Sequence, residues 1–190
     1  IADAAAQSRK DGEIEPEAFP LGHLDLRFGN LCNLKCRMCG PTDSSFWHKE
    51  HYETVSHYFH DSPGKVILEE SNGKVRVKGS NPYNWHENPA FWQQLEKNLE
   101  GVRIIHTVGG EPLLIERHFE LLRKIIESGR AKEVIIDYNS NITVISQRAL
   151  SLWKEFKEVR IGASIDAYGK INEYIRHPSK WHVTERNFDL

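Results

Sequence analysis

Short apolar runs alternate with helical patterns along most of this chain. Four runs rich in Val, Ile and Leu predict β-strands, at His23 to Phe28, Val102 to Val108, Glu133 to Tyr138 and Glu158 to Ile165. Apolar residues at helical spacing predict helices over Ala90 to Leu99, Ile115 to Ser128 and Ser146 to Phe156. Strands that alternate with helices form a parallel sheet through right-handed βαβ units. We therefore expect an α/β fold whose binding site lies at the carboxyl ends of the strands.

One interval interrupts this alternation. After a predicted helix at Asp43 to His60, the alternating segments Val66 to Glu70 and Lys74 to Lys78 flank Ser71-Asn72-Gly73. Asn-Gly between alternating apolar residues predicts a β-hairpin. A hairpin that covers the strand ends explains the alternation, and a partner-binding surface is the alternative. Asn81 to Trp85 then predicts a loop.

Composition narrows the class of protein. The chain has 190 residues, 39% of them hydrophobic, which suits one ordinary core. Its net charge of -2 gives no indication of a nucleic-acid surface, and no apolar run approaches the roughly 18 residues of a membrane span. The chain starts at Ile1, and Trp181 to Leu190 predicts a helix that runs to the last residue, so we expect a piece of a longer protein. We assign residues 1–22 to an N-terminal extension and residues 23–190 to a domain that is incomplete at its C-terminus.

All three cysteines of the chain lie in Cys32-Asn-Leu-Lys-Cys36-Arg-Met-Cys39. Thiolates are soft ligands suited to iron-sulfur clusters or zinc, and a structural site normally has four protein ligands. Three cysteines leave one metal position open, and an open position lets a metal site handle a substrate or cofactor. A clustered, odd-numbered set also argues against a disulfide framework and for a reducing compartment such as the cytoplasm.

The pattern C-x3-C-x2-C after a predicted strand resembles the signature of radical S-adenosylmethionine (SAM) enzymes, and Leu24 to Cys39 is especially similar to the branch with twitch or SPASM domains. The resemblance implies that Cys32, Cys36 and Cys39 hold a 4Fe-4S cluster whose fourth iron binds SAM. It implies that an electron from the cluster, delivered by a donor such as flavodoxin or ferredoxin, cleaves SAM to a 5'-deoxyadenosyl radical that abstracts a substrate hydrogen. Met38 stands where the family often has an aromatic residue against the adenine.

The same resemblance implies a TIM-like (β/α)6 barrel, present here in part, with about four of its six βα units and with the hairpin inserted in the first βα connection. A second motif, Gly109-Gly110-Glu111-Pro112, follows the second predicted strand. Alone, such a turn is a common way for a chain to leave a strand. Beside the cysteine motif it resembles the family's GGEP motif, which implies that its backbone and glutamate contact the SAM amino group.

Further positions match family motifs at the ends of the later strands. Asn141 matches the asparagine of a Thr-Asn-Gly segment, which implies a SAM contact, and Ile142 replaces its glycine. Ser164 and Asp166 match a Ser-x-Asp-Gly segment, which implies contact with ribose hydroxyls or substrate. Arg176 matches an arginine that pairs with the SAM carboxylate. The alternatives are a turn role for Asn141, a helix N-cap at Asp166 and a surface ion pair at Arg176.

Two function classes follow. The first is a radical SAM enzyme acting on an unidentified substrate, with peptides and proteins among the candidates. The second is a non-catalytic electron-transfer or structural module that holds an iron-sulfur cluster or zinc, which leaves the GGEP and Ser-x-Asp matches as coincidence. No cysteine follows Cys39 to hold an auxiliary cluster, and fold analogy does not select a substrate.

Overall fold

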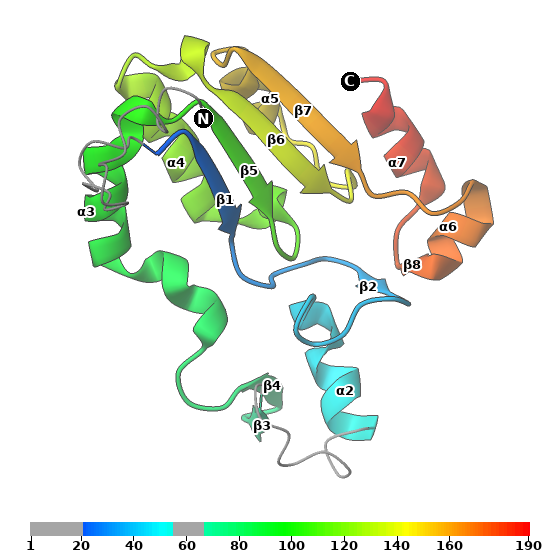
Figure 1. Ribbon diagram of the computed structural model, residues 1–190. Helices are drawn as coiled ribbons and strands as arrows, with labels where there is room; N and C mark the ends of the chain where they lie inside the picture. The colour runs from blue at the N-terminus through cyan, green and yellow to red at the C-terminus, as the bar shows by residue number, and fades with distance from the viewer. Residues whose placement is uncertain (1–20, 55–66) are drawn as a thin grey trace, which may run out of the picture.

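A computed structural model describes residues 21–54 and 67–190 (Figure 1), so most of the predicted N-terminal extension lies outside the described residues. The centre of the structure is a parallel four-stranded sheet with strand order β1-β5-β6-β7. The strands are the four that the sequence predicts, and the mixed α/β fold is confirmed. Their bounds are His23–Arg27 for β1, Ile104–Val108 for β5, Ile135–Ser140 for β6 and Glu158–Ala163 for β7.

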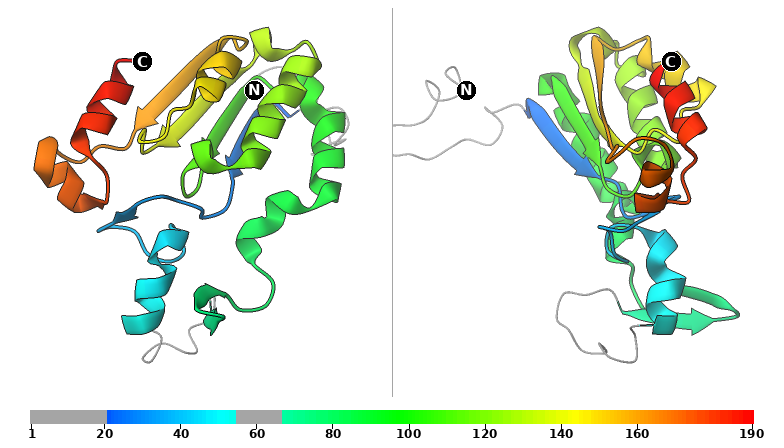
Figure 2. Two further views of the ribbon diagram at one scale, coloured as in Figure 1. Left: turned by 180° about the vertical axis from the view of Figure 1, so that it is seen from behind. Right: turned by 90° about the vertical axis from the view of Figure 1, so that its right-hand side faces the viewer.

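One face of the sheet packs against helices. Apolar strand residues such as Leu26, Ile105 and Ile136 form one buried core with residues of these helices. Figure 2 shows helices gathered along this side of the sheet. The covering helices are α3 (Pro89–Asn98), α4 (Glu116–Glu127) and α5 (Gln147–Trp153).

No helix within the described part of the chain combines the length and hydropathy that a membrane crossing requires.

The opposite face of the sheet is polar. The strand register places Asp25, His106, Asp137 and Arg160 side by side in one row across the four strands. Because successive strand residues point to opposite faces, this row lies opposite the apolar core residues. β1 and β7 are the two edges of the sheet, so the described strands form an open sheet and not a closed barrel. The parallel sheet with crossover helices is therefore confirmed, whereas the described residues show no barrel.

The predicted hairpin is confirmed. β3 (Leu68–Ser71) and β4 (Lys74–Val77) pair antiparallel across Asn72 and Gly73, whose φ angles are 53° and 72°. Positive φ at both central residues is the requirement of a type I′ hairpin turn. The hairpin lies between β1 and β5 in the chain and stands beside α2 (His48–Thr54), away from the sheet (Figure 1).

Two predictions in this interval need correction. The helix predicted at Asp43 to His60 consists of a 3-10 turn at Ser45–Trp47 followed by α2. Its last part and Val66 fall within residues 55–66, which lie outside the described residues. The segment predicted as a loop, Asn81 to Trp85, contributes to a 3-10 helix at Pro82–Glu87. The Asn81 side chain caps this helix, and Pro82 suits its first turn. Asparagine and proline therefore mark the start of a helix here, although the same residues are also typical of loops.

The chain beyond β7 returns to the cysteine loop. It forms α6 (Gly169–Ile175) and then β8 (Arg176–His177), which pairs antiparallel with β2 (Lys35–Cys36) inside the cysteine motif. The last helix, α7 (Trp181–Phe188), ends before the final residues, so the prediction of a helix through Leu190 was too long. This short β2–β8 pair brings two distant motifs together at the carboxyl ends of the sheet.

Candidate functional site

The cysteine loop leaves the carboxyl end of β1 and is held by other segments of the chain. Trp47 Nε1 donates a hydrogen bond to the carbonyl oxygen of Cys36 at 3.2 Å. Ser44 Oγ donates to the carbonyl oxygen of Leu34 at 2.7 Å. In the β2–β8 pair, Cys36 stands opposite Arg176. Contacts from Ser44 and Trp47 on one side and from the β8 strand on the other therefore fix the backbone that carries the thiols.

The Gly109-Gly110 turn packs directly against the chain that leads into Cys32. The two glycines have φ angles of 90° and 27°. A Cβ atom at Gly109 would lie 2.6 Å from the carbonyl oxygen of Gly29, and one at Gly110 would lie 2.1 Å from that of Leu31. Only glycine allows this approach. The turn therefore packs against the backbone that leads into the cysteine motif.

Glu111 connects the end of β5 to the end of β6. Its side chain is buried, and its carboxylate accepts hydrogen bonds from Ser140 Oγ at 2.8 Å, Asn141 N at 2.8 Å and Leu113 N at 3.2 Å. Burial raises the pKa of Glu111, and these hydrogen bonds oppose that rise. Both carboxylate oxygens are occupied within the protein. Pro112 is also buried and begins a 3-10 turn, so these two residues shape the strand ends.

Asn141 stands between β6 and the cysteine loop. Its Nδ2 donates to Asn33 Oδ1 at 2.9 Å and lies 3.9 Å from Cys32 Sγ. Its Oδ1 accepts from the backbone nitrogen of Thr143 at 2.9 Å, which is the turn role given above as the alternative. Asn141 therefore has a local structural role and also stands beside a thiol.

Arg176 and Asp166 contact each other beside the cysteines. Arg176 Nε lies 2.6 Å from Asp166 Oδ2 and forms no hydrogen bond with it, so the contact is an ion pair. Arg176 Nη1 lies 3.9 Å from Cys36 Sγ. The side chain of Arg176 is 16% exposed, so this is not the surface ion pair of the alternative interpretation. Asp166 does not cap a helix either, because Tyr168 occupies the N-cap position of α6.

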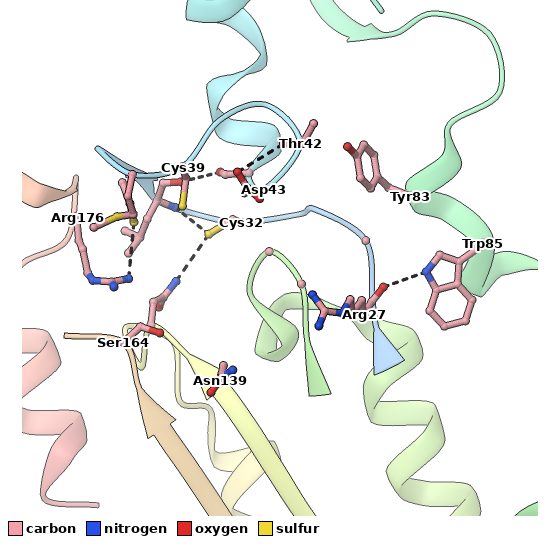
Figure 3. Close-up of a pocket in the computed structure, with 18 residues that line it drawn as sticks. Arg27, Cys32, Cys39, Thr42, Asp43, Tyr83, Trp85, Asn139, Ser164 and Arg176 are labelled. Atoms are coloured by element: carbon pink, nitrogen blue, oxygen red, sulfur yellow. Dashed lines mark hydrogen bonds between the residues drawn. The ribbon is translucent and has the colours of Figure 1, made fainter. Parts of the chain in front are cut away.

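These segments surround a cavity of about 570 Å³ at the carboxyl ends of the strands (Figure 3). Pockets of this size hold small ligands and cofactors. Glu111, Pro112 and Asp166 are not among the residues that line it. The predicted site residues that line it are Cys32, Cys36, Met38, Cys39, Gly109, Gly110, Asn141, Ser164 and Arg176.

The cavity also has lining residues that the motifs did not predict. Arg27 and Asn139 line it from the ends of β1 and β6, and Tyr83 and Trp85 line it from the 3-10 helix after the hairpin. Figure 3 shows Arg27 and Asn139 on the strand side, across from the cysteine loop. Strand alternation could have placed Arg27 and Asn139 on the polar face. No sequence signal brings Tyr83 and Trp85 to the cavity, because their position depends on tertiary packing.

The chemistry of the three thiols fits an iron-sulfur cluster. Burial raises the pKa of Cys36 to about 12 and also raises the pKa values of Cys32 and Cys39, and the neighbouring thiolates repel one another. A bound cation reverses this preference because it stabilises thiolates. Within residues 21–54 and 67–190, no three Cys, His, Asp or Glu side chains are grouped so as to hold a single ion. A cluster binds its cysteines through different iron atoms, so it does not require one shared ion.

Solved structures with a similar fold come from SuiB of Streptococcus suis. SuiB bound to S-adenosylmethionine has a TM-score of 0.50 and 18% identity, over 89% of this chain and 30% of that chain. A second SuiB structure has a TM-score of 0.49 and 16% identity, over 89% and 29% of the two chains. SuiB bound to the precursor peptide SuiA has a TM-score of 0.44 and 19% identity, over 83% and 27%.

At these identities the likeness concerns the fold alone. This chain spans no more than 30% of the length of the SuiB chains. No protein-family model and no curated protein matches the sequence. The SuiB structure with a TM-score of 0.50 therefore supports a shared α/β architecture.

Proposed function

We propose that this chain is the cofactor-binding core of a radical SAM enzyme, in which Cys32, Cys36 and Cys39 hold a 4Fe-4S cluster and SAM binds beside it. The observation that carries the proposal is that motifs as far apart as Cys32 and Arg176 line a single cavity. The structure of SuiB with bound SAM, which shares the fold, supports it. When bound, the cluster supplies the electron that cleaves SAM to methionine and a 5'-deoxyadenosyl radical, which abstracts a substrate hydrogen.

The groups around the thiols match the parts of SAM in the proposal. The guanidinium of Arg176 suits the SAM carboxylate, because its planar fork can donate two parallel hydrogen bonds. The backbone of Gly109-Gly110 lines the cavity and suits the amino group, and Asn141 and Ser164 line it with polar groups for the ribose hydroxyls. Met38 is 57% exposed at the cavity and offers a polarizable surface for the adenine.

Two of the predicted residues act through their neighbours in this proposal. Glu111 accepts the hydrogen bond from Asn141 N and so positions the turn that carries the Asn141 side chain. Asp166 pairs with Arg176 and orients its guanidinium. We assign both as positioning residues and not as direct ligands of SAM.

Anaerobic reconstitution of the chain with iron and sulfide tests the proposal. We expect a 4Fe-4S absorption and electron paramagnetic resonance spectrum, SAM binding by equilibrium dialysis, and release of 5'-deoxyadenosine after addition of dithionite. Cys36→Ala should abolish all of these, whereas Ser151→Ala, an exposed position on α5, should leave them unchanged. A chain that forms a cluster but neither binds nor cleaves SAM would be an electron-transfer or structural module instead.

The substrate and partners extend the proposal. Through the resemblance of Leu24 to Cys39 to the twitch or SPASM branch, we propose a peptide or protein substrate. We propose a flavodoxin-like or ferredoxin-like protein as the electron donor, because the cluster needs one electron at a time. A cytoplasmic setting suits three cysteines that must stay reduced.

A further inference from the structure

The strand side of the cavity contains two polar side chains that the proposed SAM site does not use. Arg27 is the last residue of β1, and Asn139 lies one residue before the end of β6. β5 separates these strands, and Arg27 is paired there with Val108. Because neighbouring strands are about 4.8 Å apart, the two backbones lie about 10 Å apart. A long arginine side chain and a small ligand group can fill that distance.

The hydrogen-bond donors of Arg27 are largely unused. Its side chain is 74% exposed, and Asp25 Oδ2, the acceptor it contacts, is 3.5 Å away. That distance is longer than a strong hydrogen bond. Its backbone is nevertheless fixed, because Trp85 Nε1 donates to the carbonyl oxygen of Arg27 at 2.9 Å. The backbone of Arg27 is therefore fixed, while the donors of its guanidinium remain largely available to a ligand.

The side-chain amide of Asn139 is also available to a ligand. Its side chain is exposed at the cavity and forms no hydrogen bond with any residue in the described part of the chain. Gly162 on β7 provides the space for it, because a Cβ at Gly162 would lie 2.7 Å from Asn139 Oδ1. Both donors thus stand at the strand side of the cavity, across from the cysteine loop (Figure 3).

We propose that Arg27 and Asn139 recognise a carboxylate of the substrate. This inference rests on the proposed function, because it names the substrate class for the same cavity. A guanidinium fork on one side and an amide donor on the other match a carboxylate held between them. The next row of the same face contains Asp25, His106, Asp137 and Arg160, and Arg160 is paired with Glu158. Carboxylates therefore outnumber guanidinium groups there, and a dianionic phosphate would meet more repulsion than a single carboxylate. An acidic side chain or terminal carboxylate of a peptide has this chemistry.

Titration of the 15N-labelled chain with N-acetylglycine tests the inference by nuclear magnetic resonance. N-acetylglycinamide is the neutral isostere, and methyl phosphate is the dianion. We expect N-acetylglycine to shift the side-chain resonances of Arg27 and Asn139 and to bind more tightly than both other probes. Arg27→Gln should weaken this binding about tenfold or more, and Asn139→Ala about threefold. Arg160→Gln is the matched control on the same face, because both oxygens of Glu158 already bind its guanidinium at 2.8 and 2.9 Å.

Several results would overturn the inference. These are equal binding of N-acetylglycine and its amide, unchanged binding in Arg27→Gln, an equal loss in Arg160→Gln, or tighter binding of methyl phosphate. The spectra also report whether each variant is folded. SAM binding by the reconstituted chain is measured separately. If the chain does not bind SAM but binds N-acetylglycine selectively, the proposed function alone is contradicted. If it binds SAM but shows no selective binding of N-acetylglycine, this inference alone is contradicted.

Discussion

The α-carbon of Gly110 lies against the carbonyl oxygen of Leu31, so closely that a Cβ at Gly110 would stand 2.1 Å from that oxygen. The same carbonyl accepts a hydrogen bond from Glu111 N at 2.7 Å. The end of β5 and the residue before Cys32 therefore form one rigid unit. The two motifs that are far apart in the sequence are joined through backbone atoms, which no change of rotamer can move aside.

Gly110→Ala should consequently lower the free energy of unfolding by about 2–4 kcal/mol, since the methyl group must displace backbone. Denaturant unfolding monitored by circular dichroism measures this loss. Gly22→Ala is the matched control, because a Cβ there has no atom within 4 Å, and it should change stability by less than about 0.5 kcal/mol. Equal stability of the Gly110 variant and the Gly22 variant would contradict the packing described.

Glu111→Gln should also destabilise the chain, although the two side chains have the same shape. The carboxylate accepts from Leu113 N through one oxygen and from Asn141 N through the other. A glutamine amide has one acceptor oxygen, so its NH2 group must face one of these backbone donors. We expect a loss of about 1–3 kcal/mol in denaturant unfolding. Glu155→Gln, at an exposed position, should change little, and a similar small effect at Glu111 would argue against the buried network.

The sequence predicted the fold well where the signal is local. The four strands and the hairpin follow from apolar alternation and from Asn72-Gly73, which need only neighbouring residues. Closure of a barrel could not be predicted from the same patterns, because it depends on which strands meet at the edges of the sheet. The loop at Asn81 to Trp85 was predicted wrongly because polar capping residues begin short helices as readily as they form turns.

Ile142 shows how tertiary contacts override local preference. The resemblance placed Ile142 where the family has glycine, and Ile142 adopts a φ of 49°, which is unfavourable for a β-branched residue. Its backbone nitrogen donates to Ser140 Oγ at 3.0 Å, and its carbonyl oxygen accepts from Asn187 Nδ2 at 2.8 Å. These contacts, and burial of the side chain, retain the conformation without glycine.

The candidate site was predictable where a motif marks it, and strand alternation could predict only the face of the sheet for Arg27 and Asn139. The cysteines and Gly109-Gly110 stand out in the sequence, whereas Arg27 and Asn139 are single polar residues in strands. Their place on the cavity depends on strand register and on the open face of the sheet. The sequence also could not predict that the Glu111 side chain is directed into the protein, because that orientation depends on a hydrogen bond from Ser140 in the adjacent strand.

Arg176→Lys should weaken SAM binding by the reconstituted chain about tenfold or more, because an ammonium group cannot reproduce the two parallel hydrogen bonds of the guanidinium. Equilibrium dialysis with labelled SAM measures the affinity. Arg37→Lys is the matched control, since its guanidinium lies over the ring of Tyr174 at 4.4 Å and outside the cavity lining. Unchanged affinity in the Arg176 variant would remove this residue from the proposed SAM site.

We expect His118 to make the fold sensitive to acid. It is fully buried, and its Nε2 shares a hydrogen bond with Tyr138 Oη at 2.8 Å. Trp153 Nε1 donates a hydrogen bond to the same hydroxyl at 2.9 Å. Burial lowers the pKa of His118 to about 3, whereas an unfolded histidine has a pKa of about 6.5. Between these values the unfolded state binds more protons than the folded state. Stability should therefore fall as pH falls from about 6.5, by up to about 1.4 kcal/mol per pH unit from this residue.

Urea unfolding of the wild type and of His118→Gln at pH 7, 6, 5 and about 4 separates this contribution from those of other groups. We expect the variant to be less stable at pH 7, because it loses buried packing, but to lose less stability on acidification. Tyr138→Phe is the control at the same location: it removes the hydroxyl and leaves His118 buried, so it should keep the wild-type pH dependence at a lower overall stability. Parallel curves for wild type and His118→Gln would show that proton uptake by His118 does not drive the loss, whereas convergence at low pH would identify it as the group that must ionise when the core opens.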